Sequence, residues 1–287
     1  MSTMNVKSPK GKLIAIGGAV DKGSSLDSDN SENPSTQFLE LGILKRLLEE
    51  LIGDTNRLEI ITTASHIPKE TGQNYVDAFK RLGNENVGVM HIKEREDTQN
   101  PEYIKRMEKA EGVLITGGNQ LRLTSIFGGT DILKIMLKRY QNEKFVLAGT
   151  SAGAMAMSNT MIYHGSSSEA LLKGEVKMSR GLGFIKDVTF DSHFIKRGRF
   201  GRLCQAIASN PVCIGIGLGE DTGLLISKGD HMEAIGSGLV IIVEGNDIKY
   251  TNVADIEDGL PISIENLTVH VLSQGHSYIF SERRMVH

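Results

Sequence analysis

Up to residue 150 the chain alternates between short apolar segments rich in β-branched residues and longer segments with apolar residues at helical spacing. Strands are predicted over 12–16, 58–63, 87–91, 112–116 and 144–148. Helices are predicted between them over 35–51, 72–82, 102–109 and 131–141, the first with Ser35 as its N-cap. A strand–helix–strand connection makes neighbouring strands parallel, and strands this apolar are covered on both faces. The sequence therefore predicts an α/β fold whose central sheet is mostly parallel and is flanked by helices on both faces.

The pattern changes after residue 151. Helices are predicted over 152–157 and 199–209, and strands over 161–164, 187–190, 212–216, 223–226, 239–243 and 267–271. We expect these additional C-terminal strands to extend the same sheet and to add a small antiparallel section. No linker or repeat interrupts the chain, so residues 12–287 are expected to form a single domain after a disordered or frayed segment, residues 1–11.

The composition argues against several classes of protein. The 287 residues include 32 Lys and Arg against 35 Asp and Glu, and a net charge of −3 argues against a nucleic-acid-binding protein. The apolar run 13–20 contains Gly17 and Gly18 and is far shorter than a membrane span, so no membrane association is expected. The two cysteines, Cys204 and Cys213, form no CxxC motif, which favours a reducing, cytoplasmic location.

The segment Gly149-Thr150-Ser151-Ala152-Gly153 matches the pattern G-x-S-x-G between a predicted strand and a predicted helix. In that setting the pattern is typical of a nucleophile elbow, a sharp turn that exposes a serine hydroxyl above the sheet. The alternative is an incidental serine in a glycine-rich turn, but the strand–turn–helix context favours Ser151 as a nucleophile. The N–H of Ala152 opens the predicted helix, where it can stabilise an oxyanion.

A second glycine-rich segment, Thr116-Gly117-Gly118-Asn119-Gln120, follows the predicted strand 112–116. It should lie near Ser151, because open α/β folds build their sites at the carboxyl edge of the sheet. The N–H of Gly118 is the candidate for a second oxyanion donor, and Gln120 could bind a substrate amide or carboxylate. The chain has no dinucleotide fingerprint and no regular metal-ligand spacing, so no cofactor and no metal are expected.

A nucleophilic serine needs a general base, and His193 is the best candidate among the eight histidines. It lies in Asp191-Ser192-His193-Phe194, just after the predicted strand 187–190, so it should emerge at a strand end. Four cations follow it closely, namely Lys196, Arg197, Arg199 and Arg202. Such a cluster suits the recognition of carboxylates, since arginine presents a planar fork to an anion. The alternative is a solvated basic face.

Three carboxylates are candidates for the acid that orients His193. Glu220 follows the predicted strand 212–216, Glu169 ends the run Ser166-Ser167-Ser168-Glu169, and Asp191 lies beside the histidine. The acid accepts a hydrogen bond from Nδ1–H and fixes the tautomer, so any of the three could serve chemically.

Four segments together resemble the cyanophycinase family: Ile16-Gly17-Gly18-Ala19, Thr116 to Gln120, Gly149 to Ala154, and Asp191 to Phe194 with Arg197, Arg199 and Arg202. The resemblance runs from residue 12 to beyond residue 220, and the combination is specific where each piece alone is not. Members of that family are serine peptidases related to aspartyl dipeptidase, with a class I glutamine amidotransferase-like fold. The resemblance also implies a homodimer.

The resemblance implies hydrolysis of cyanophycin, a poly-aspartate with arginine joined to each side-chain carboxyl. The product is the β-Asp-Arg dipeptide, released from a chain end by acyl-enzyme chemistry. Carried over to this chain, Ser151 is the nucleophile, His193 the general base and Glu220 the orienting acid. Glu169 is the alternative acid, since aspartyl dipeptidase has its acid shortly after the serine. The implied substrate-binding residues are Gln120, Asp191, Arg197, Arg199 and Arg202, and the implied oxyanion donors are Gly118 and Ala152.

Two other functions are compatible with the same motifs. One is an aspartyl dipeptidase-like peptidase that acts on small Asp-containing peptides, and the other is a non-catalytic binding module on the same fold. The long segment after residue 220 disfavours the dipeptidase. The presence of a serine, a histidine and an acid argues against the binding module.

Overall fold

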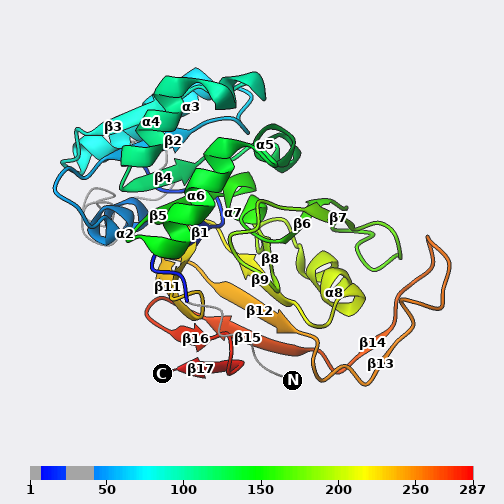
Figure 1. Cartoon of the computed structure of the whole chain (residues 1–287). Helices are drawn as coiled ribbons and strands as arrows, with labels where there is room; N and C mark the ends of the chain where they lie inside the picture. Colours follow the sequence, from blue (N-terminus) through cyan, green and yellow to red (C-terminus); the bar gives the residue numbers. More distant parts are fainter. Residues whose placement is uncertain (1–7, 24–41, 287) are drawn as a thin grey trace.

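The computed structural model describes residues 8–23 and 42–286, and a nine-stranded sheet lies at the centre of the described residues (Figure 1). Its parallel half is made of β1 (Lys12–Ile16), β2 (Leu58–Ile61), β3 (Val87–Met90), β4 (Gly112–Ile115) and β5 (Val146–Thr150). These strands lie in the order β1-β5-β4-β2-β3, and each neighbouring pair is parallel. The α/β fold class predicted from the sequence is confirmed.

Helices cover both faces of this half of the sheet. They are α2 (Ile43–Glu50), α3 (Pro68–Arg81), α4 (Pro101–Lys109), α5 (Gln120–Phe127) and α6 (Asp131–Asn142). Alternate residues of β1 enter two separate apolar cores: Ile14 and Ile16 pack with α2 and α3, whereas Leu13 and Ala15 pack with α4, α5 and α6. Because side chains alternate along a strand, a strand buried on both faces must be apolar throughout, as β1 is.

The C-terminal strands divide between two sheets. Four of them extend the central sheet beside β1: β10 (Thr222–Ser227), β11 (His231–Gly236), β16 (Ser277–Ile279) and β17 (Arg284–Val286). Four others form a second sheet: β8 (Val188–Asp191), β9 (Ile214–Leu218), β12 (Val240–Glu244) and β15 (Thr268–Leu272). The expected extension of the central sheet is confirmed for the first group. The second group forms a sheet of its own with antiparallel pairs at β12, and the sequence does not predict that it is separate, because periodicity locates a strand without showing its neighbour.

The helix α8 (Phe200–Ser209) connects β8 to β9, which makes these two strands parallel. Two short pairs complete the fold, β6 (Thr160–His164) with β7 (Lys177–Arg180) and β13 (Tyr250–Thr251) with β14 (Ile264–Glu265). None of the described helices is long and apolar enough to cross a membrane.

Several predicted boundaries differ from those observed. The N–H groups of Lys10 and Gly11 donate to carbonyls at the end of α6, so the last two residues of the segment expected to be frayed are hydrogen-bonded to this helix. The strand predicted over 144–148 is Val146–Thr150, and the sequence pattern does not predict α5. The Ser35 N-cap and the start of its helix lie outside the described residues, as do residues 1–7.

Candidate active site

Ser151 occupies a sharp turn between β5 and α7 (Ala152–Ala156), with φ 51° and ψ −109°. Its N–H donates to the carbonyl of Ile16 in β1 at 2.8 Å. Both flanking glycines are needed for this turn. A β-carbon on Gly149 would lie 2.5 Å from the backbone of Gly153, and one on Gly153 would lie 2.2 Å from the carbonyl oxygen of Ile115. The turn therefore fixes the serine hydroxyl at the carboxyl edge of the parallel strands.

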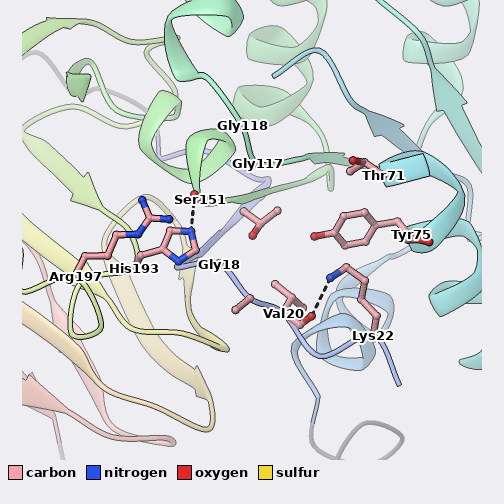
Figure 2. Close-up of a pocket in the computed structure, with 13 residues that line it drawn as sticks. Gly18, Val20, Lys22, Thr71, Tyr75, Gly117, Gly118, Ser151, His193 and Arg197 are labelled. Carbon is pink, nitrogen blue, oxygen red and sulfur yellow. Dashed lines mark hydrogen bonds between the residues drawn. The ribbon is translucent and has the colours of Figure 1, made fainter. Parts of the chain in front are cut away.

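His193 lies just after β8 and faces Ser151 (Figure 2). Its Nε2 is 3.0 Å from Ser151 Oγ, and its Nδ1 is 2.9 Å from Oε1 of Glu220. A carboxylate only accepts hydrogen bonds, so Nδ1 carries the proton and Nε2 presents a lone pair to the serine hydroxyl. The side chains of His193 and Glu220 are 17% and 25% exposed, so the pair is only partly screened by water.

Backbone contacts bring these three residues together from strands of two different sheets. The N–H of His193 donates to the carbonyl of Gly17 at 2.9 Å, immediately after β1. A β-carbon on Gly17 would lie 2.0 Å from the carbonyl oxygen of Gly219, so only glycine allows this approach. The end of β1 is thus held against the segment that carries Glu220.

Two of the three candidate acids, Glu220 and Glu169, have different surroundings. Glu220 contacts His193, and its second oxygen, Oε2, is buried without a partner among the described residues. Glu169 is exposed between β6 and β7, where its carbonyl accepts from the N–H of Leu172. The contact with the imidazole therefore belongs to Glu220.

A pocket of about 400 Å³ opens beside Ser151. The predicted oxyanion donors lie at the serine: Gly118 lines the pocket, and Ala152 is the first residue of α7, where its N–H has no acceptor within the helix. A β-carbon on Gly117 would lie 3.3 Å from that of Ser151, and one on Gly118, whose φ is +138°, would lie 1.9 Å from the carbonyl oxygen of Ala64. Glycine at these two positions lets the backbone pack closely against Ser151 and Ala64.

The far wall of the pocket is not predicted by the sequence motifs. It consists of Lys22, after β1, and of Thr71, Asn74 and Tyr75 on α3. Burial raises the pKa of Tyr75 to about 12, so its phenol remains a hydrogen-bond donor at neutral pH. The sequence does contain one signal for these residues, which is their position. The start of a helix that follows a parallel strand lies at the carboxyl edge of the sheet, where the site is expected.

The predicted substrate-binding residues fall into two groups. Arg197 is exposed and lines the pocket. Asp191 is 0% exposed and Arg202 only 4%, and the two form a buried ion pair. Neither side chain lines the pocket beside Ser151, and the buried carboxylate of Asp191 is stable there because charged groups pair with it. The contact of these two residues with substrate stays a prediction. A single sequence does not distinguish such pairing from a pocket lining.

Arg199 and Gln120 also support neighbouring backbone. Arg199 contacts Asp191 at 3.2 Å and donates to the carbonyl of Ser192 at 2.7 Å, which braces the residue before His193. Burial lowers the pKa of Arg199 from its usual value, an effect that Asp191 opposes. The side-chain amide of Gln120 donates to the carbonyl of Ile162 at 3.1 Å, so it ties α5 to β6.

The fold and the site define an α/β protein with a hydrogen-bonded serine, histidine and carboxylate at the carboxyl edge of a parallel sheet. Within residues 8–23 and 42–286 no three His, Cys, Asp or Glu side chains are grouped so that they could hold a metal ion. The model of peptidase family S51 matches residues 31–235. The chain belongs to this peptidase family.

Relatives with a curated description support this membership. The chain is 34% identical over 277 residues to the cyanophycinase of Trichormus variabilis, covering 96% of this chain and 88% of that one. It is 33% identical over 269 residues to the cyanophycinase of Geminocystis herdmanii, covering 94% and 93%. A crystal structure of a peptidase from an acI-B1 Actinobacterium has the same fold, with a TM-score of 0.65 and 24% identity over 96% of this chain and 98% of that one.

Proposed function

We propose that this protein is a serine-type exopeptidase that hydrolyses cyanophycin to β-Asp-Arg dipeptides. The observation that carries the proposal is the chain of contacts from Ser151 through His193 to Glu220, beside a pocket, in a protein similar to curated cyanophycinases along nearly its full length. In this proposal the turn at Ser151 acts as a nucleophile elbow.

The chemistry follows from which group holds the proton. His193 Nε2 takes the proton of the Ser151 hydroxyl as Oγ attacks the scissile carbonyl, and Glu220 stabilises the imidazolium that forms. The N–H groups of Gly118 and Ala152 bind the oxyanion. His193 then protonates the leaving amine, which leaves an acyl group on Ser151. A water molecule, deprotonated by His193, attacks this acyl group, and the proton returns to Ser151 when the acid is released.

The pocket suits a substrate that carries carboxylate groups. The described residues that line it include two cations, Lys22 and Arg197, and no Asp or Glu. An arginine joined to aspartate through its amino group keeps a free carboxylate, so each unit of cyanophycin presents one. Arg197 can bind such a carboxylate through its planar fork.

Incubation with cyanophycin granules tests the proposal. We expect mass spectrometry to detect β-Asp-Arg with the parent protein and none with Ser151→Ala. Free arginine without dipeptide would show that the cleavage site is wrong. Cleavage of small Asp-containing peptides with no action on the polymer would support the dipeptidase alternative, and inactivity on both would support the binding module.

We further propose that the protein is a homodimer, as its resemblance to the family implies, and that it is cytoplasmic, as its two cysteines without a CxxC motif favour. The edge strand β15 exposes Val269 and Val271, which are 42% and 50% accessible in the isolated chain. A molar mass of 31.3 kDa by light scattering, which is the mass of one chain, would contradict the dimer.

A further inference from the structure

Lys22 holds its ammonium group at the edge of the pocket, on the side opposite the nucleophile. Figure 2 shows Lys22 and Tyr75 across the pocket from Ser151, His193 and Arg197. The Nζ atom lies 5.2 Å from the centre of the Tyr75 ring and donates to the carbonyl of Val20 at 3.2 Å. These two contacts orient the ammonium group, and an ammonium has three N–H donors, so donors remain for a ligand.

No described carboxylate lies within ion-pair distance of Lys22. Asp221 interacts electrostatically with Lys22, but its oxygens accept from the N–H of Asp21 and from the hydroxyl of Ser237. A half-buried cation without an ion-pair partner among the described residues favours an anion that enters from solvent.

The phenol of Tyr75 stands next to this cation. It is buried, and its hydroxyl interacts with the side chain of Thr150, the residue before the nucleophile. A neutral phenol and a lysine ammonium side by side provide two donors for the two oxygens of a carboxylate.

We propose that Lys22 and Tyr75 form a subsite for the free arginine carboxylate of a substrate unit, on the side of Ser151 opposite Arg197. The inference rests on the proposed function. A scissile bond at Ser151 joins two units, and each carries one such carboxylate. Two cations on opposite sides of the nucleophile therefore match one carboxylate on each side of the bond. Lys22 is thus a specificity-determining residue that fixes the position of the bond relative to Ser151.

A binding cycle tests the subsite in the Ser151→Ala background, which prevents turnover. The probes are β-Asp-Arg and the same dipeptide with its arginine carboxylate amidated, and calorimetry gives the Kd of each. We expect Lys22→Met and amidation each to weaken binding about tenfold, as expected for loss of one charge-assisted contact. Amidation should then have no further effect in Lys22→Met. Lys22→Arg should restore most of the affinity, and Tyr75→Phe should show a smaller loss.

The control is Lys80→Met, which removes an exposed lysine of the same helix α3 as Tyr75 but outside the pocket. It should leave all affinities unchanged. The subsite is overturned by any of three results: Lys22→Met binds the dipeptide as tightly as the Ser151→Ala background, amidation weakens binding equally with and without the Lys22→Met change, or the dipeptide does not bind at all. A failure of the proposed function is detected by a different measurement: the protein with Ser151 intact would then release no dipeptide from cyanophycin.

Discussion

A β-carbon on Gly18 would lie 2.3 Å from Cε1 of the His193 imidazole, closer than any van der Waals contact allows. The backbone after β1 therefore forms one wall of the slot that holds the ring between Ser151 and Glu220. The glycine is required both for this contact and for its φ of +121°.

Gly18→Ala should displace the imidazole and lower kcat about a hundredfold, because a displacement of a catalytic group by about 1 Å reduces the rate by about this factor. Gly83→Ala is the matched control: its φ is +85°, but nothing lies within 4 Å of its β-carbon. That change should cost only about 1–2 kcal/mol of stability and leave kcat unchanged. Equal kcat values for the two variants would contradict the packing of Gly18 on the ring.

Glu220→Gln should lower kcat about 10³–10⁴-fold, since an amide no longer stabilises the imidazolium and can turn the ring to the wrong tautomer. Glu169→Gln should change kcat less than about twofold, because Glu169 is an exposed side chain away from His193. Steady-state rates on cyanophycin measure both. A larger loss of kcat in Glu169→Gln than in Glu220→Gln would show that Glu169 is the acid that orients His193.

Asp191→Asn should lower the free energy of unfolding by about 3–5 kcal/mol, because it leaves the buried guanidinium of Arg202 without its counter-charge. Arg197→Met should change stability by less than about 0.5 kcal/mol but raise KM, because Arg197 is exposed beside the pocket. Chemical denaturation and kinetics separate the two. An Asp191→Asn protein with full stability and a raised KM would instead show that Asp191 contacts substrate directly, as predicted from the sequence.

Thiol reagents should not inhibit the enzyme. Burial raises the pKa of the Cys204 thiol to about 11, so at pH 8 only about one molecule in a thousand carries the reactive thiolate. Because the shift is upward, reactivity should rise only as the pH approaches that pKa. Iodoacetamide at pH 8 should leave dipeptide release intact. Inactivation in step with alkylation of Cys204 would contradict this.

The sequence is sufficient to predict the parallel half of the fold, and the reason is visible in β1. Its residues are apolar on both faces because two cores bury them. The second sheet is beyond prediction, since the pairing of β12 with β9 and β15 depends on contacts between distant segments.

The candidate site is partly predictable for a similar reason. Ser151, His193 and Glu220 each follow a strand, and the ends of strands meet at one place. The pairing of Asp191 with Arg202 is not predictable, because residue type alone does not show whether a charge is buried. Lys22 and Tyr75 belong to no recognisable sequence motif, and only the folded chain brings them together on one wall of the pocket.

The central claim is that His193 activates Ser151 as the nucleophile, and covalent labelling with diisopropyl fluorophosphate tests it most directly. Intact-mass measurement should show one adduct per chain, and peptide mapping should place it on Ser151. Ser151→Ala should remain unlabelled, and His193→Ala should label far more slowly. A parent protein that stays unlabelled while it cleaves cyanophycin, or an adduct on another residue, would contradict the account.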